Sequence, residues 1–285
     1  MSNLIDSSSL ADALYARQPV RLLDVRWRLD APEGRPAYLE RHIPRAVYVD
    51  LEHDLSRPGN PQDGRYPLPS LSELEASARR WGIDDGDLVV AYDDNDGVAA
   101  ARAWWLLRRR GVDIRVLDGG IRGWIGAGLP LQTGDYVPRP GSVRLLDIDP
   151  GTVTLSETAR APHDGHLVDA RAPHHYRGRV QGQDPYAGHI PGAVNIPTVA
   201  HIANDGTLRH PEVIRQTLRS AGIDDDRPVV LYCGAGIASA LSALAFAEAG
   251  IETRVFPGSW SQWSRTPGAP VAVGAAPGDI FSRES

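Results

Sequence analysis

Residues 228–239 read Pro228-Val229-Val230-Leu231-Tyr232-Cys233-Gly234-Ala235-Gly236-Ile237-Ala238-Ser239, and the chain continues into the Ala- and Leu-rich run 240–246. A short apolar run rich in β-branched residues predicts a buried strand, and the Ala- and Leu-rich run predicts a helix. The loop between them carries two glycines and the only cysteine of the chain. This order places Cys233 at the carboxyl end of a strand, facing the N-terminus of a helix.

The predicted surroundings of Cys233 favour a thiolate nucleophile. Backbone N–H groups at a helix N-terminus have no intrahelical acceptor, and the helix dipole favours negative charge there. A lone cysteine is most often a small buried hydrophobe. A core position, however, needs no glycines at Gly234 and Gly236, whereas a loop that turns its amides towards an anion does. We therefore expect Cys233 to be catalytic.

Length and composition limit the possible functions. The 285 residues suffice for two domains with proper cores, and a net charge of −6 without a basic stripe argues against a nucleic-acid partner. A single cysteine excludes an intramolecular disulfide and indicates a reducing compartment. Residues 1–6 lack signal-peptide character, and no apolar run approaches the ~20 residues of a membrane helix. We expect a cytoplasmic protein without a membrane partner.

The two halves of the sequence repeat one pattern, with matching positions 139 to 147 residues apart. The matching pairs are Leu22-Leu23-Asp24-Val25-Arg26 with Leu167-Val168-Asp169-Ala170-Arg171, His42-Ile43-Pro44 with His189-Ile190-Pro191, residues 89–92 with 229–232, and Trp124 with Trp263. Two copies of one β/α unit account for this spacing. Short strands alternating with helices predict a largely parallel sheet, covered on both faces, in each copy.

This α/β pattern predicts two domains with different roles. We expect an N-terminal domain at 1–130, a Pro- and Gly-rich linker at 131–150 and a C-terminal domain at 151–285. Where the second copy has Cys233, the first has Asp93, in the acidic loop 93–97. This loop lacks the ligand spacing of a calcium site, and we interpret it as a cap of the helix that follows. The first domain is then non-catalytic.

Together these features resemble the tandem-domain rhodanese family, the thiosulfate and 3-mercaptopyruvate sulfurtransferases. The resemblance covers nearly the whole chain. It rests on the paired Asp-x-Arg strands, the paired His-Ile-Pro-x-Ala turns, the strand–Cys–loop–helix and the closing Gly-Ser-Trp-Ser-Gln-Trp at 258–263. It implies two rhodanese-like domains, each a mainly parallel sheet with helices on both faces.

The resemblance implies sulfur transfer in two half-reactions. The Cys233 thiolate takes the sulfane sulfur of a small donor, forms a persulfide and passes the sulfur to a thiol or cyanide acceptor; a protein acceptor is a further option. Six successive amides, from Gly234 to Ser239, can solvate the persulfide anion. With no second cysteine, the outer sulfur must leave to an external nucleophile.

The donor is predicted from the loop. Thiosulfate-specific members carry basic residues after the cysteine, whereas this neutral loop is closer to the mercaptopyruvate type. Ala235 replaces the loop serine of that type, and Glu52 stands where that type has an aspartate. His175 occupies the position of the first substrate-binding arginine. Arg177 and Arg179 can substitute for it, or they are solvated loop arginines.

Other polar and aromatic residues are expected to be structural. His42 and His189 occur in both copies, as do the Asp-x-Arg pairs 24–26 and 169–171, so we expect them to hold turns rather than to react. Trp260 and Trp263 are expected to pack around the active loop. No metal or organic cofactor is implied, because the sequence has no cysteine cluster and no spaced His/Glu motif.

Two alternative functions were weighed. Cysteine phosphatases share this type of fold but need a longer loop and an arginine six positions after the cysteine. Position 239 is Ser, and no arginine follows before Arg254, which argues against phosphate-ester hydrolysis. The second alternative is a sulfur carrier or regulatory binding module with little turnover, which the missing loop serine motivates.

Overall fold

Two compact units make up the chain. The computed structural model describes residues 2–149, 151–180, 182–224 and 226–278. Unit 1 comprises Met1–Arg57, Leu68–Pro150 and Ala203–Leu208, and unit 2 comprises Pro58–Pro67, Gly151–Ile202 and Arg209–Ser285. Each unit thus contains one segment from the other half of the sequence.

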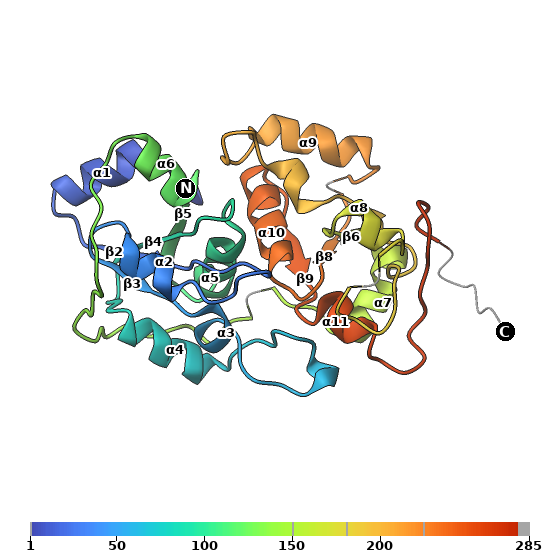
Figure 1. The fold of residues 1–285 in the computed structure, drawn as a ribbon. Coiled ribbons are helices and arrows are strands. Elements are labelled where there is room, and N and C mark those ends of the chain that lie inside the picture. Colours follow the sequence, from blue (N-terminus) through green and yellow to red (C-terminus); the bar gives the residue numbers. More distant parts are fainter. Residues whose placement is uncertain (1, 150, 181, 225, 279–285) are drawn as a thin grey trace. The chain divides into compact units, whose positions relative to one another are not determined.

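Unit 1 contains a five-stranded parallel sheet with strand order β1-β5-β4-β2-β3, of which Figure 1 labels β2 to β5. Its elements are β1 (Leu4–Ile5), α1 (Ser7–Tyr15), β2 (Val20–Asp24), α2 (Arg35–Glu40), β3 (Ala46–Tyr48), α3 (Leu51–Asp54), α4 (Leu71–Arg80), β4 (Leu88–Tyr92), α5 (Val98–Arg108), β5 (Asp113–Leu117) and α6 (Gly120–Gly126).

Unit 2 contains a four-stranded parallel sheet with strand order β7-β6-β8-β9. Thr152 adds a single parallel bridge to Val255 in β9, in the place where β1 pairs with β5 in unit 1. The elements of unit 2 are η1 (Pro61–Asp63), α7 (Leu155–Asp164), β6 (His166–Asp169), α8 (Pro173–Tyr176), β7 (Val194–Asn195), η2 (Thr198–His201), α9 (Pro211–Ser220), β8 (Val229–Tyr232), α10 (Ala238–Glu248), β9 (Thr253–Val255) and α11 (Ser259–Trp263).

The same register repeats in both sheets and confirms the predicted α/β duplication. Asp24 lies beside Tyr92 in unit 1, and Asp169 lies beside Tyr232 in unit 2. The residue that follows the central strand is therefore Asp93 after β4 and Cys233 after β8. Both lie at the carboxyl end of a parallel sheet, where α/β proteins commonly place their functional residues.

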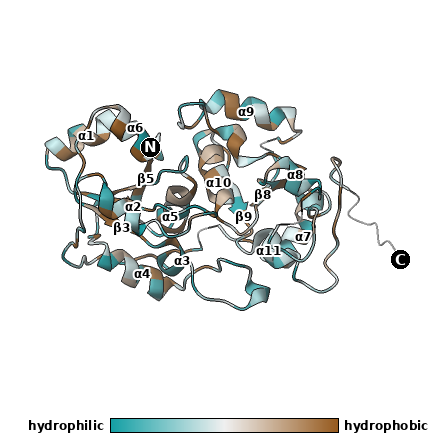
Figure 2. Cartoon of the chain, viewed as in Figure 1, coloured by the Kyte–Doolittle hydropathy of each residue, from teal (hydrophilic) through white to brown (hydrophobic). Residues whose placement is uncertain are grey.

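Buried helices follow these two strands. Residues Ala99–Leu107 of α5 and Ser239–Phe246 of α10 are buried, as expected for helices with apolar residues on all sides. Helix α9 differs, because Ile214 and Leu218 are buried while most of its surface is polar; Figure 2 shows both colours along it. Each loop between such a strand and its helix is short, and both of its ends are buried. The strand and the helix therefore limit the conformations that the loop can adopt.

Both predicted histidine turns are structural. His42 is buried, its Nδ1 lies 2.9 Å from the Tyr38 carbonyl oxygen, and its ring stacks on Tyr38. His189 is also buried, with Nδ1 at 2.8 Å from the Tyr176 carbonyl oxygen and its ring stacked on Tyr176. Both copies of the motif therefore share the Nδ1 contact and the ring stack.

The Asp-x-Arg pairs also make structural contacts. Nη2 of Arg26 donates to Asp24 at 2.6 Å and to the Arg41 carbonyl oxygen at 2.6 Å. Nη2 of Arg171 makes the matching bonds, to Asp169 and to the Gly188 carbonyl oxygen, both at 2.6 Å. Each pair links the end of a central strand to the turn before the histidine.

Asp93 caps α5, as expected for the first copy. Its carboxylate is fully buried and accepts four backbone N–H bonds: Oδ1 from Asn95 and Gly97, and Oδ2 from Ala99 and Ala100, at 2.8 to 3.0 Å. Burial raises the pKa of this carboxyl, and the four amide bonds act in the opposite direction. We call such a set of converging backbone N–H groups an amide cup. In unit 1 the Asp93 carboxylate fills it.

We predict that Asp93→Ala lowers the free energy of unfolding by about 2 kcal/mol, because it leaves several buried N–H groups without acceptors. Urea denaturation, with Asp30→Ala at an exposed position as the matched control, measures this loss. Equal unfolding midpoints for the two variants would show that the cup does not stabilise unit 1.

Candidate active site

Cys233 lies where the sequence predicts it, between β8 and α10. Its side chain is buried, with 2% of its surface exposed, while the neighbouring Gly234 is partly exposed. The Gly236 N–H donates to Cys233 Sγ at 3.1 Å. Helix α10 begins at Ala238, so its first amides have no intrahelical acceptor. Part of the predicted amide cup is therefore seen in the Gly236 bond.

Gly236 can be replaced by no other residue without a change in the loop. Its φ of +78° is a conformation that L side chains rarely adopt. A Cβ built on Gly236 would lie 2.2 Å from the Pro257 carbonyl oxygen. Both constraints act on the one residue whose amide points at the sulfur.

Ser259, which sequence reasoning did not single out, supports Cys233 from the next loop. It is fully buried and has a φ of +52°, which is unusual for a residue other than glycine. Its Oγ accepts the Cys233 N–H at 3.2 Å, donates to the Phe256 carbonyl oxygen at 2.9 Å and lies 3.9 Å from Sγ. In the sequence Ser259 belongs to the Gly-Ser-Trp motif at 258–260, in which a packing role is predicted for the tryptophan alone.

A cationic side chain lies beside the loop although the loop itself is neutral. Arg65 belongs to Pro58–Pro67, the segment of unit 2 taken from the first half of the sequence. A Cβ built on Gly234 would lie 3.4 Å from Arg65 Nη2. The segment is held by the Arg65 N–H, which donates to Ser261 Oγ at 2.8 Å, while the Ser261 N–H donates to the Gly234 carbonyl oxygen at 2.9 Å.

Asp184 binds two arginines in this region. Its side chain is 8% exposed, and Oδ1 accepts from Arg265 Nη1 at 2.6 Å and from Arg65 Nη1. Arg265 Nη1 also donates to the Ser261 carbonyl oxygen at 2.7 Å. Neither Arg65 nor Asp184 is predicted from the sequence, because neither belongs to the Cys233 loop or to a motif that the two halves share.

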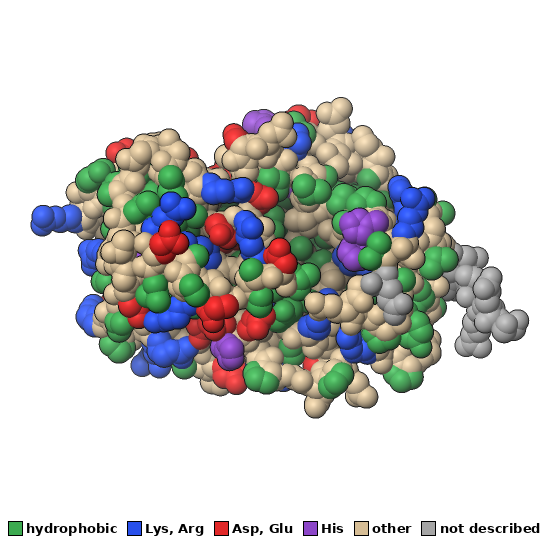
Figure 3. All heavy atoms as spheres, viewed as in Figure 1, with side chains coloured by type: hydrophobic (Ala, Val, Ile, Leu, Met, Phe, Trp, Pro, Cys, Tyr) green, Lys and Arg blue, Asp and Glu red, His purple; other side chains and the backbone are tan. Residues whose placement is uncertain are grey.

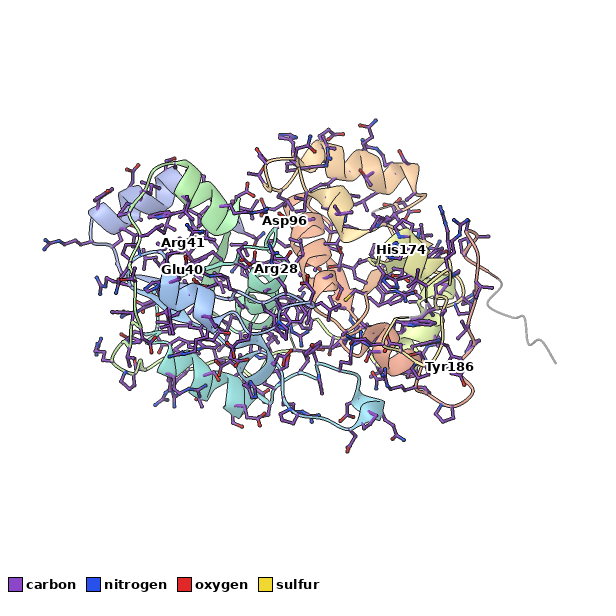
Figure 4. All side chains as sticks on the ribbon, in the orientation of Figure 1. Arg28, Glu40, Arg41, Asp96, His174 and Tyr186 are labelled. Carbon is purple, nitrogen blue, oxygen red and sulfur yellow. The ribbon has the colours of Figure 1, made fainter. Side chains whose placement is uncertain are left out.

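His175 lies in α8 and is half-buried, next to the exposed His174 with ring centroids 4.4 Å apart. Figure 3 shows histidine side chains at the surface where Figure 4 labels His174. Burial, followed by the His174 and Arg171 charges, lowers the pKa of His175 and favours its neutral form.

The other predicted substrate-binding residues differ in their surroundings. Arg177 and Arg179 are exposed, and within the described residues neither side chain forms an ion pair. Glu52 belongs to α3 of unit 1, where its Oε1 accepts from Trp27 Nε1 at 3.2 Å.

Both tryptophans pack as predicted. Trp260 is buried, donates through Nε1 to the Tyr186 carbonyl oxygen at 3.2 Å, and has the Arg171 guanidinium 4.6 Å from its ring centroid. Trp263 donates to the Pro270 carbonyl oxygen at 2.8 Å, which matches the Trp124 bond to the Pro130 carbonyl oxygen in unit 1. Figure 4 labels the exposed Tyr186 near α11.

Two features are absent from the described residues. No group of three or more His, Cys, Asp or Glu side chains in this part of the chain is arranged to hold a metal ion. Among the described helices, none has the length and apolar character needed to cross a membrane.

Known proteins share this sequence and fold. The sequence profile of the rhodanese-like domain matches residues 7–127 and 154–266. SseB of Mycobacterium tuberculosis strain H37Rv, named as a thiosulfate sulfurtransferase, is 43% identical over 96% of this chain and 98% of its own. Human 3-mercaptopyruvate sulfurtransferase is 33% identical over 91% of each chain.

Solved structures agree with the sequence matches. The 3-mercaptopyruvate sulfurtransferase SseA from Escherichia coli superposes with a TM-score of 0.82 at 26% identity, over 91% of this chain and 99% of that one. The enzyme from Leishmania major gives a TM-score of 0.83 at 28% identity, over 92% of this chain and 74% of that one. With its duplicated sheets and one cysteine at the carboxyl end of β8, the chain belongs to the rhodanese family and is a sulfurtransferase of the thiosulfate and 3-mercaptopyruvate type.

Proposed function

We propose that Cys233 is the nucleophile and carries the transferred sulfur as a persulfide. The observation that supports this best is the Gly236 N–H, which points at Sγ from 3.1 Å in a loop leading into the N-terminus of α10. Such donors stabilise negative charge on sulfur. The loop residues Gly234 to Ser239 then surround the outer sulfur.

The proposed reaction has two steps. In the first, the Cys233 thiolate attacks the donor sulfur, and an S–S bond forms as the bond from that sulfur to the rest of the donor breaks. The leaving group takes the electron pair as the pyruvate enolate or as sulfite. In the second, an external thiol or cyanide attacks the outer sulfur and regenerates the thiolate, since the chain has no second cysteine. A protein thiol is a further candidate acceptor.

The roles of the two units and the cellular location follow as proposals. In unit 1 the Asp93 carboxylate fills the amide cup, so we assign a non-catalytic role to the N-terminal domain.

Arg177 and Arg179 stay candidates for binding the sulfur donor because they are exposed. A single free cysteine fits a reducing compartment, and we propose the cytoplasm.

The donor that we propose is 3-mercaptopyruvate. The side chains from Gly234 to Ser239 are all uncharged, which suits a donor whose charge lies on a carboxylate away from the sulfur. The E. coli and human relatives are named for this donor.

After treatment with 3-mercaptopyruvate, we predict that intact-mass analysis shows about 32 Da added to the wild type and no addition to Cys233→Ser. Repeated turnover with a thiol acceptor distinguishes an enzyme from a carrier, which would load one sulfur and stop. Sulfur addition to Cys233→Ser would refute the assigned nucleophile.

Gly236→Ala tests the amide contact to the sulfur. We expect kcat/KM per folded molecule to fall at least about 100-fold, because the clash with the Pro257 carbonyl oxygen moves the amide away from Sγ. Gly222→Ala is the matched control: its φ is +75° and its Cβ would meet nothing within 4 Å. The control is expected to cost about 1 kcal/mol of stability and to retain activity. A Gly236→Ala enzyme as active as this control would exclude the contact from catalysis.

For donor choice, we predict a higher kcat/KM with 3-mercaptopyruvate than with thiosulfate, because this ratio reports differential binding in the transition state. Steady-state rates with cyanide as the common acceptor provide the measurement. Higher efficiency with thiosulfate would contradict the proposed donor.

A further inference from the structure

We infer that Asp184 determines donor specificity, by neutralising one of two arginine charges beside the Cys233 loop so that the site favours a donor with one negative charge. This inference rests on the proposed function, because it concerns the donor that delivers sulfur to Cys233.

The first step is the charge of the cluster. Asp184 Oδ1 accepts from both Arg65 and Arg265, and its side chain is only 8% exposed. Two guanidinium groups and one carboxylate sum to a single positive charge. Arg171 adds little to this balance because two bonds to Asp169 occupy its Nε and Nη2 groups.

The second step is the position of the cluster relative to the loop. Ser261 links them: its Oγ accepts the Arg65 N–H at 2.8 Å, its carbonyl oxygen accepts from Arg265 at 2.7 Å, and its N–H donates to the Gly234 carbonyl oxygen at 2.9 Å. Because of these three bonds, a shift of the two arginines would also shift the loop next to Cys233.

The third step concerns the hydrogen-bond donors of Arg65 that have no acceptor in the described part of the chain. Asp184 uses Nη1, while Nε is buried and, among the described residues, has no hydrogen-bond partner. Nη2 lies on the Gly234 side. A planar guanidinium with unused N–H groups matches a carboxylate better than a point charge would. The unused hydrogen-bond capacity of Arg65 therefore points to an anionic ligand beside Gly234, the residue that follows Cys233.

Charge then decides between donors. A carboxylate donor such as 3-mercaptopyruvate brings one negative charge, which the net positive charge of the cluster balances. Thiosulfate brings two, so its second charge is unbalanced and repelled by Asp184. Removing the Asp184 charge leaves two positive charges and favours the dianion.

The test measures kcat/KM for both donors in Asp184→Asn, Asp184→Glu, Arg65→Gln and the wild type. We expect Asp184→Asn to raise the thiosulfate-to-mercaptopyruvate ratio on the order of tenfold, mainly through KM, and Asp184→Glu to keep the wild-type ratio. Arg65→Gln should raise KM for both donors. Asp164→Asn, an exposed carboxylate on α7, is the matched control and should leave the ratio unchanged.

Each outcome decides the inference. An unchanged ratio in Asp184→Asn, or an equal loss for both donors, would overturn the role of Asp184 in specificity. Failure of the proposed function is recognised separately, because wild-type protein would then gain no sulfur on Cys233 from either donor.

Discussion

The fold depends on one electrostatic requirement: amides at the start of a buried helix need an acceptor at the end of the preceding central strand. In unit 1 the Asp93 carboxylate meets this need with four N–H bonds. In unit 2 the residue at the same place is Cys233, whose sulfur accepts the Gly236 amide. The carboxylate satisfies the amides permanently. A thiol carries the matching negative charge only as a thiolate, so the Gly236 amide favours the charged form of the Cys233 sulfur.

The backbone around the thiol is arranged at some cost in conformational freedom. Gly236 and Ser259 both have positive φ values, and only one of them is a glycine. Ser259 keeps its conformation because its Oγ is bonded both to the Cys233 N–H and to the Phe256 carbonyl oxygen. Strain of this kind persists where surrounding contacts hold it, and it commonly marks functional sites.

Local patterns in the sequence predicted most of the fold and the place of Cys233 between β8 and α10. The strand 229–232, the Cys233 loop, the histidine turns and the Asp-x-Arg pairs follow from short-range periodicity and from the repeat. The cluster beside the loop did not follow, because Arg65 lies 168 positions before Cys233 and reaches unit 2 through the exchanged segment Pro58–Pro67. The residues of the loop carry no charge, but the side chains of the cluster beside the loop do. No local pattern reports such an exchange.

The duplication also explains how one scaffold holds two different residues at the same point. The hydroxyl of Tyr92 accepts the Ile43 N–H at 3.1 Å, and that of Tyr232 accepts the Ile190 N–H at 3.1 Å. Together with the Asp-x-Arg pairs, these bonds fix each strand end without using the side chain that follows. The residue after Tyr92 or Tyr232 is therefore constrained by the amides in front of it and not by the sheet behind it. A carboxylate there caps the helix in unit 1, and in unit 2 the same place holds the Cys233 thiol.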